Sequence, residues 1–273
     1  MDDAFRTIKI RGVQYHVYEA GEGTPLLMLH GFTGSHEVFQ PFVRALGKQF
    51  HCIVPDLLGH GQTDAPLETS RYAMDETLAD LACLLDEFDI PRAHVFGYSM
   101  GGRIALSFAA SFPQRVHRLV LEGASPGLRT EEERRARRAS DDALATKLES
   151  QGVAAFVRDW EEIPLFASQK RLPKEQFLRQ RAVRESQRAK GLAASLRGIG
   201  TGAQPSMWPH LSEIEARTLL ITGELDRKFT GIASDMSRQL PHCDKVVIAN
   251  AGHTPHVEEP QSFISALADF LTS

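Results

Sequence analysis

The sequence predicts an α/β protein with a mostly parallel central sheet, helices on both faces of that sheet, and a helical insertion. Short apolar runs, typical of strands buried on both faces, alternate with stretches in which apolar residues recur at helical spacing. The alternation stops between residues 124 and 205, where only helical patterns occur, and it resumes afterwards. We therefore expect one α/β core, residues 1–123 and 206–273, with a helical cap at 124–205.

The individual elements follow from these patterns in order. Residues 5–10 and 13–19 alternate apolar and polar side chains around an Arg-Gly pair, which predicts an antiparallel hairpin. Continuous apolar runs predict buried strands at 26–29, 51–54, 93–96, 118–122, 218–222 and 245–248. Helical spacing predicts helices at about 35–46, 72–88, 104–110 and 261–271.

A serine flanked by glycines stands between a predicted strand and a predicted helix, in the pentapeptide GYSMG at residues 97–101. A chain that turns from strand to helix within about one residue brings its backbones together, so side chains at Gly97 and Gly101 would clash. The turn would hold the Ser99 hydroxyl at the helix N-terminus, where free N–H groups favour developing negative charge. This context is that of a nucleophile elbow, and it predicts Ser99 as the reactive residue.

A reactive serine needs a histidine within hydrogen-bond reach and a carboxylate that holds the histidine in the right tautomer. In a parallel sheet these residues lie in loops after the carboxyl ends of strands. Asp226 and His253 follow the last two predicted strands, and the order Ser99, Asp226, His253 is one that occurs in such triads. Glu224 is the rival to Asp226, and His256 is the rival to His253.

The reaction also needs donors for a developing oxyanion, which two backbone N–H groups can supply. Met100 follows the predicted nucleophile, so its N–H is the first candidate. The second is the N–H of Phe32, in the loop after the strand at 26–29, where Gly31 allows a close backbone approach. A tight turn alone is the alternative role for this loop.

Composition and charge limit the cellular compartments and the classes of binding partner that the sequence favours. The chain has 273 residues and a net charge of −4, so nothing points to nucleic acid or to an anionic membrane surface. No apolar run approaches the roughly 18 residues of a membrane span. Three widely spaced cysteines and an acidic start without an apolar segment predict a cytoplasmic protein. The sequence does not indicate an oligomeric state.

The predicted cap differs from the core in charge. Residues 124–205 carry 16 basic and 11 acidic side chains, a net charge of +5, whereas the rest of the chain carries −9. Solvated helix faces with i,i+3 and i,i+4 ion pairs account for many of these charges. Arginines above an active site would also suit a small-molecule substrate with several carboxylates.

Several segments resemble the α/β-hydrolase superfamily over nearly the whole chain: HGF at 30–32, PDLLGHG at 55–61, GYSMGG at 97–102 and GH at 252–253. Others resemble the 2-succinyl-6-hydroxy-2,4-cyclohexadiene-1-carboxylate synthases of menaquinone biosynthesis. These are YSMGGR at 98–103, LEGASPGL at 121–128, WEEIPLFAS at 160–168, GLAASLRG at 191–198 and GTGAQPSMW at 200–208. Caps diverge faster than cores in such proteins, so the matches within the cap are the more informative ones.

The resemblance implies an α/β-hydrolase fold and a lyase that works with a hydrolase-type triad. Its substrate would be 2-succinyl-5-enolpyruvyl-6-hydroxy-3-cyclohexene-1-carboxylate, which has three carboxylates. Abstraction of the ring proton next to the succinyl ketone would eliminate pyruvate and leave a conjugated diene. Such a reaction needs no metal and no organic cofactor, and either Ser99 or His253 could be the immediate base.

The resemblance also implies substrate-binding residues, which are Tyr98, Arg103, Arg137, Trp160 and Arg184. Arg103 lies one helical turn after the predicted nucleophile. A one-residue slip in the arginine-rich segment at 134–138 would substitute Arg134 or Arg138 for Arg137, and Arg184 has several arginine neighbours. Trp160 could instead belong to the core of the cap.

Two other functions use the same sequence features. A serine hydrolase of esters or carbon–carbon bonds would share the triad, and a non-catalytic ligand receptor would share only the fold. The complete set of Ser99, Asp226 and His253 argues against the receptor, and the cap arginines argue against a neutral ester substrate.

Overall fold

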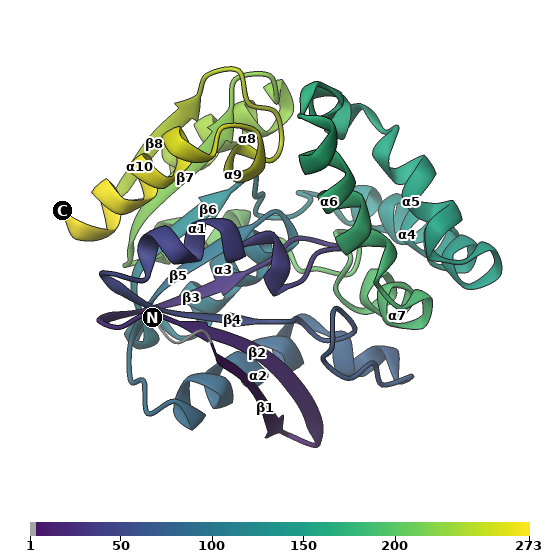
Figure 1. Cartoon of the computed structure of the whole chain (residues 1–273), viewed down its shortest axis with the longest axis horizontal. Helices are drawn as coiled ribbons and strands as arrows, with labels where there is room; N and C mark the ends of the chain where they lie inside the picture. The colour runs from purple at the N-terminus through teal and green to yellow at the C-terminus, as the bar shows by residue number, and fades with distance from the viewer. Residues whose placement is uncertain (1–3) are drawn as a thin grey trace.

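An eight-stranded sheet crosses the computed structural model, which describes residues 4–273 (Figure 1). The strand order is β1-β2-β4-β3-β5-β6-β7-β8; β2 runs antiparallel to β1 and β4, and the other neighbours are parallel. The strands are β1 (Ala4–Ile10), β2 (Val13–Ala20), β3 (Thr24–Leu29), β4 (Phe50–Pro55), β5 (Ala93–Tyr98), β6 (Val116–Glu122), β7 (Arg217–Gly223) and β8 (Cys243–Ile248). The predicted hairpin and mostly parallel sheet are confirmed.

Helices cover both faces of the sheet and form a separate group between β6 and β7 (Figure 1). The α-helices are α1 (Gln40–Leu46), α2 (Met74–Glu87), α3 (Met100–Ser111), α4 (Glu131–Gln151), α5 (Val153–Glu161), α6 (Lys174–Glu185), α7 (Ala189–Ile199), α8 (Arg227–Ser237), α9 (Pro255–Glu258) and α10 (Pro260–Thr272). Short 3-10 helices are η1 (His36–Val38), η2 (Thr69–Tyr72), η3 (Pro113–Arg115), η4 (Pro164–Arg171) and η5 (Trp208–Glu213).

The sheet separates two apolar clusters. Successive side chains of a strand point to opposite faces, so Leu27 and Val95 belong to one cluster, and Met28 and Phe96 belong to the other. All four side chains are fully buried, as expected for strands that are covered on both sides. The first cluster includes residues of α2, α3 and α8, and the second includes residues of α1 and α10.

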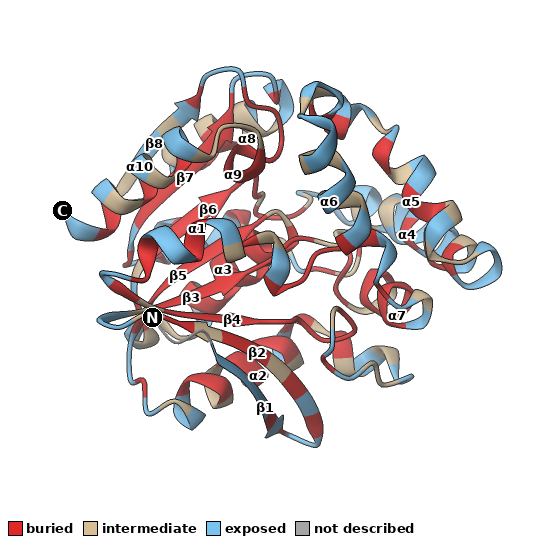
Figure 2. Ribbon diagram, viewed as in Figure 1, coloured by how far each residue is buried: buried red, intermediate tan, exposed pale blue. Residues whose placement is uncertain are grey.

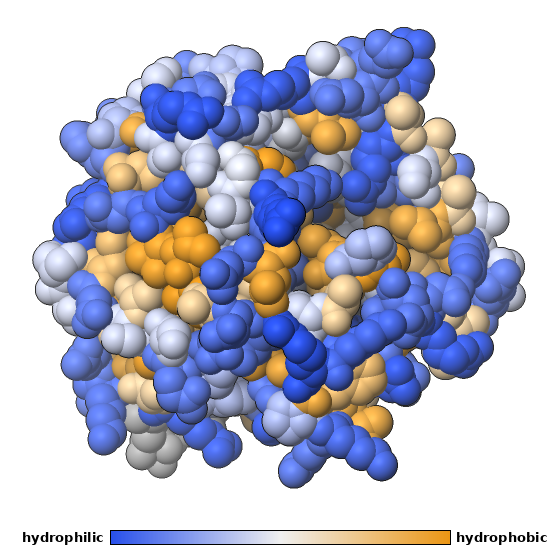
Figure 3. Space-filling model, turned by 90° about the horizontal axis from the view of Figure 1, so that it is seen from above, coloured by the Kyte–Doolittle hydropathy of each residue, from blue (hydrophilic) through white to orange (hydrophobic). Residues whose placement is uncertain are grey.

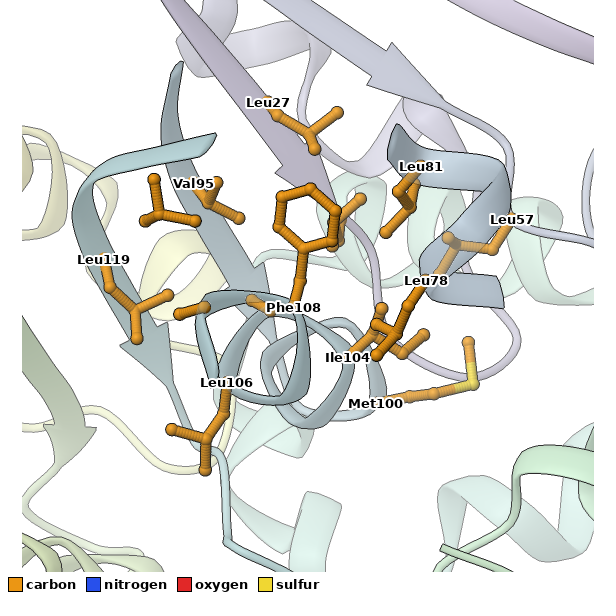
Figure 4. Packing of buried hydrophobic residues seen from close by; sticks show 14 of the residues in the cluster. Leu27, Leu57, Leu78, Leu81, Val95, Met100, Ile104, Leu106, Phe108 and Leu119 are labelled. Atoms are coloured by element: carbon orange, nitrogen blue, oxygen red, sulfur yellow. The ribbon is translucent and has the colours of Figure 1, made fainter. Parts of the chain in front are cut away.

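Helix α3 is the best anchored helix of the core. Every residue from Met100 to Ala109 is buried, and Ile104 and Phe108 pack towards Leu78 and Leu81 of α2 in the cluster that Figure 4 shows. Each fully buried side chain of this size contributes about 1.5–3 kcal/mol. The start of α3, where the elbow serine stands, is therefore held by packing along the whole helix.

The predicted helices differ from the structure in several places, and α3, for example, begins at Met100 rather than at 104. The helix expected at 35–46 divides into η1 and α1, because Pro41 near the start of α1 has no N–H to continue a helix that begins earlier. The helix expected at 72–88 begins as the 3-10 turn η2. Helix α8 was not predicted, since its start depends on the side-chain cap from Asp226 rather than on a long apolar pattern.

Helices α4 to α7 occupy the part of the chain where the sequence predicts the cap. Thr130 and Glu133 start α4 with reciprocal side-chain-to-backbone bonds, and most of this helix is exposed (Figure 2). A small apolar cluster around Leu148, Phe156 and Leu192 joins α4, α5 and α7. The boundaries of the cap at 124 and 205 stay a prediction.

The face of the molecule shown in Figure 3 is mainly polar. Figure 3 shows hydrophilic residues over much of one face, with apolar residues in smaller patches between them. None of the helices within residues 4–273 has the length and apolar character that crossing a membrane requires.

Candidate active site

Ser99 stands at the turn between β5 and α3. Its φ of 51° lies in the left-handed region, which L-residues other than glycine seldom adopt, so the turn is strained. A Cβ at Gly97 would lie 2.3 Å from the carbonyl oxygen of Gly101, and a Cβ at Gly101 would lie 2.0 Å from that of Leu29. Both glycines are therefore required by the close approach of α3 to the strands.

His253 and Asp226 complete a hydrogen-bonded series with Ser99. The Nε2 atom of His253 lies 3.1 Å from Ser99 Oγ, and its Nδ1 atom lies 2.7 Å from Asp226 Oδ2. The carboxylate accepts the Nδ1–H proton, which leaves Nε2 free to accept the serine proton. The three residues come from the ends of β5, β7 and β8, so the carboxyl edge of the sheet brings them together.

The two rival residues lie in other networks. Glu224 is exposed, and its carboxylate accepts the backbone N–H of Asn250 at 3.0 Å. His256 binds Glu122 through its backbone N–H at 3.0 Å and through Nδ1 at 2.8 Å, and both side chains are buried. The geometry thus joins Asp226 and His253, rather than their rivals, to Ser99.

A cavity of about 190 Å³ opens beside the serine, between the core and the cap. Phe32 and Met100, whose N–H groups are the predicted oxyanion donors, both line it. Within residues 4–273, no protein acceptor takes a hydrogen bond from the backbone N–H of either residue. Both groups are thus available to an oxygen atom bound next to Ser99.

The cavity is cationic. Arg103, Arg137 and Lys228 line it, and none of the lining residues that the described chain contributes is acidic. Arg134 and Arg138 do not line it; they bind Glu131 instead. A cavity with this lining favours an anionic ligand, because the described lining carries three positive charges and Asp141, which binds Arg137, does not line it.

Arg103 is the most deeply buried of these cations, with 8% of its surface exposed. Its Nη1 donates to the carbonyl oxygen of Ile199 at 3.0 Å and to Gln204 Oε1 at 2.6 Å. Burial, together with the positive charge of Arg137, lowers the pKa of Arg103 to about 10, while Asp141 opposes the shift. Asp141 is held by Arg137 at 2.7 Å, so two guanidinium groups share one nearby carboxylate.

Tyr98 and Trp160 form aromatic walls of the cavity. Burial, and secondarily the charge of Glu122, raise the pKa of Tyr98, so the phenol stays protonated and can donate a hydrogen bond. Trp160 stacks on Phe156 at 5.3 Å and meets Phe32 edge-on at 5.6 Å. Its buried Nε1–H has no acceptor among residues 4–273, which leaves a donor that a ligand can satisfy.

Arg184 differs from the other predicted substrate-binding residues. It does not line the main cavity but a neighbouring small pocket of about 30 Å³, which Tyr98 and His256 also line. Its guanidinium binds Glu161 Oε1 at 3.0 Å and Gln169 Oε1 at 2.7 Å. Arg184 therefore lies in a different pocket from Arg103 and Arg137, and its guanidinium already donates hydrogen bonds to acceptors of the protein.

Some lining residues were not predicted from the sequence. Lys228, Ser125, Ser195 and Thr201 add polar groups to the cavity wall. Lys228 could have been suspected from its place two residues after Asp226, at the start of the helix after β7. The other three carry no such signal, because they enter the cavity only through the fold of the cap and the loop after β6.

One group of side chains away from the cavity has the composition of a metal site. His16, His36 and Asp56 offer ligand atoms within 4.8 Å of one another. Asp56, however, already accepts the backbone N–H groups of His36 at 2.8 Å and Gln62 at 2.9 Å. None of the three ligand residues lines the cavity beside Ser99. The prediction that the reaction needs no metal concerns that cavity and stays a prediction.

Comparison with known proteins agrees with the geometry. The family model described as "alpha/beta hydrolase fold" matches residues 24–260, which span the elbow, the cap and the histidine loop. The chain belongs to the α/β-hydrolase family. The α/β-hydrolase fold predicted from the motifs is thereby confirmed.

Within the α/β-hydrolase family, the chain is similar to several proteins that are named as synthases. A Bacillus subtilis protein provisionally named 2-succinyl-6-hydroxy-2,4-cyclohexadiene-1-carboxylate synthase is 44% identical, over 96% of each chain. The synthase of that name from Salmonella paratyphi C is 34% identical, over 91% of this chain and 94% of the relative. The solved structure of MenH from S. aureus is 37% identical, with a TM-score of 0.90 over 94% of this chain and 97% of that chain.

Proposed function

We propose that this protein is a 2-succinyl-6-hydroxy-2,4-cyclohexadiene-1-carboxylate synthase, a lyase of menaquinone biosynthesis that releases pyruvate from an enolpyruvyl cyclohexene acid. The observation that carries the proposal is a cavity directly beside the Ser99–His253 pair, to which residues 4–273 contribute three cations and no acid. The similarity to synthases of that name over almost the whole chain supports it.

The reaction begins with removal of the ring proton next to the succinyl ketone. His253, oriented by Asp226, draws the proton from Ser99 Oγ, and the serine oxygen takes the ring proton. The electrons of the C–H bond move onto the ketone and give an enolate. The proton ends on His253, where the carboxylate of Asp226 stabilises the positive charge.

The enolate oxygen needs hydrogen-bond donors that stabilise its negative charge. The N–H groups of Phe32 and Met100 have this role in the proposal. When the enolate collapses, a ring double bond forms next to the ketone, the existing ring double bond shifts by one position, and the C–O bond to the enolpyruvyl group breaks. The leaving enolate of pyruvate takes up the proton held by His253, which restores the triad, so atoms and charges balance without water, metal or organic cofactor.

The carboxylates of the substrate account for the cations of the cavity. Arg103 and Arg137 lie close enough to influence one another electrostatically, and a bound carboxylate would relieve their repulsion. Lys228 offers a further partner from α8. Tyr98 and Trp160 would add hydrogen bonds and an aromatic wall to the ring of the substrate.

The compartment is part of the same proposal. Cys52, Cys83 and Cys243 are all free thiols, which is typical of a reducing compartment. We therefore propose a cytoplasmic enzyme acting on a small-molecule polycarboxylate.

The test is the release of pyruvate by the purified protein from the enolpyruvyl substrate, followed by a coupled pyruvate assay and by absorbance of the conjugated diene. Ser99→Ala should lower turnover by at least about a thousandfold and keep substrate binding. A protein that leaves this substrate unchanged but rapidly cleaves aryl esters would be a serine hydrolase, and the lyase proposal would be wrong.

A further inference from the structure

One carboxylate holds the backbone on both sides of His253. Glu258 Oε2 accepts the N–H of Gly252 at 2.8 Å, and its Oε1 accepts the N–H of Thr254 at 3.1 Å. Oε1 also accepts the hydroxyl proton of Thr254 at 2.7 Å. Since charged acceptors form the stronger hydrogen bonds, Glu258 fixes the residues before and after the histidine.

The same threonine is bonded to the cap. Gln169, on η4, donates its Nε2–H to Thr254 Oγ1 at 2.9 Å, and its Oε1 accepts a proton of Arg184 Nη2 at 2.7 Å. The donors all point one way, from the guanidinium through the amide and the hydroxyl to the carboxylate of Glu258. Each bond in such a series polarises the next one.

The middle of the series is protected from water. Gln169 is 2% exposed and Thr254 is 4% exposed, so lost hydrogen bonds there are not replaced by solvent. The cap also contacts the loop next to this series, because a Cβ at Gly252 would lie 2.0 Å from Ser168 Oγ. The segment η4 therefore rests directly on the loop that carries His253.

We infer that Gln169 is a positioning residue that joins Arg184 of the cap to the His253 loop and keeps His253 aligned with Ser99. It touches neither substrate nor the reacting atoms. The inference uses the role that the proposed function gives to His253, but not the identity of the substrate. It follows that Arg184 contributes to the reactivity of Ser99 even without a carboxylate ligand.

The test is covalent labelling of Ser99 by a small neutral fluorophosphonate, which needs the triad but no lyase activity. The label forms a Ser99 Oγ–P bond, fluoride leaves, and His253 takes the serine proton. Gln169→Leu removes both bonds of the amide. Gln169→Glu keeps the acceptor for Arg184 and removes the donor to Thr254. Gln151→Glu, on the exposed end of α4, is the matched control.

We expect the maximal labelling rate to fall about tenfold in both Gln169 variants, with little change in the concentration for half-maximal rate. Arg184→Gln should also lower the maximal rate of labelling by the neutral fluorophosphonate. In the double variant Thr254→Val with Gln169→Leu, the labelling rate should be only slightly lower than in either single variant. Thr254→Ser, which keeps the hydroxyl, should restore the rate of wild type. Gln151→Glu should label normally.

Thermal unfolding of each variant separates positioning from folding, because rates are compared only between folded proteins. A wild-type labelling rate in folded Gln169→Leu and Gln169→Glu would overturn the inference. The inference would also be overturned if the variants raised only the label concentration for the half-maximal rate and left the maximal labelling rate unchanged. Failure of the protein to release pyruvate, with normal dependence of labelling on Gln169, would overturn the proposed function alone.

Discussion

The carboxylate of Asp226 divides its two oxygens between His253 and the start of α8. Oδ2 lies 2.7 Å from His253 Nδ1, and Oδ1 accepts the backbone N–H of Phe229 at 3.1 Å. One side chain therefore orients the histidine and caps the helix that follows β7. The orientation of His253 and the start of α8 therefore depend on the same residue.

This division predicts different effects for two substitutions at Asp226. Asp226→Asn keeps an oxygen for the helix cap but offers an amide to His253, so turnover should fall about 10³- to 10⁴-fold with a small change in stability. Asp226→Ala loses the cap as well and should be destabilised by a further ~1 kcal/mol. Pyruvate release and urea unfolding measure the two effects. Equal stability of the two variants would contradict the capping role.

Arg103 should be the most important cation of the cavity, since it is buried and lies next to the elbow. Arg103→Met should lower kcat/KM by about 10- to 150-fold, because a hydrogen bond to a charged group contributes about 1.5–3 kcal/mol. Arg238→Met is the control, since this arginine is 69% exposed and lies outside the cavity. Steady-state kinetics of pyruvate release measure this effect. An equal fall in kcat/KM in both variants would show that Arg103 has no special role in substrate binding.

Lys228 stands in an unfavourable place for stability, in the first turn of α8, where the helix dipole repels a cation. Its ammonium group contacts the ring of Phe229 at 5.5 Å, and no ion pair to it occurs within residues 4–273. Lys228→Met should therefore raise KM about fivefold, the effect of an exposed ion pair, without lowering Tm. Lys228→Arg should keep the affinity of wild type. A lower Tm with unchanged KM would indicate a structural role.

The elbow should tolerate no side chain at Gly101. A Cβ there would lie 2.0 Å from the carbonyl oxygen of Leu29, so Gly101→Ala should destabilise the protein by several kcal/mol or prevent folding. Gly231, in α8, has nothing within 4 Å of a Cβ position. Gly231→Ala should be stabilising by ~0.5–1 kcal/mol. Urea unfolding of the pair tests the steric argument, and similar unfolding curves would refute it.

His60 should make stability depend on pH. Burial, with a smaller contribution from His30, lowers the pKa of His60 to about 3 from the ordinary 6.5. The unfolded chain then binds a proton that the folded chain does not, so stability falls as pH drops from 6.5 towards 3, by up to ~1.4 kcal/mol per pH unit. Urea unfolding at several pH values should show a shallower fall for His60→Gln. Parallel curves would exclude His60 as the cause.

The sequence by itself determined the strands and the chemistry at their ends. A parallel strand that is buried on both faces must be a continuous apolar run, so β3 and β5 could be read directly, and the loops after them had to meet at one edge of the sheet. Local constraints also favour Ser99 as the candidate nucleophile, because only glycine fits at Gly97 and Gly101. The triad geometry follows from chain order and sheet topology.

Only the tertiary structure decided which cations share the cavity. The arginine-rich segment of α4 is helical, so a shift of one residue turns a side chain by about 100°, and the fold alone directs Arg137 rather than Arg134 or Arg138 inwards. Lys228 lines the cavity because α8 directly follows β7. Arg184 lies outside the cavity, and its guanidinium binds Glu161 and Gln169. These contacts join residues far apart in the chain, and no local sequence pattern encodes them.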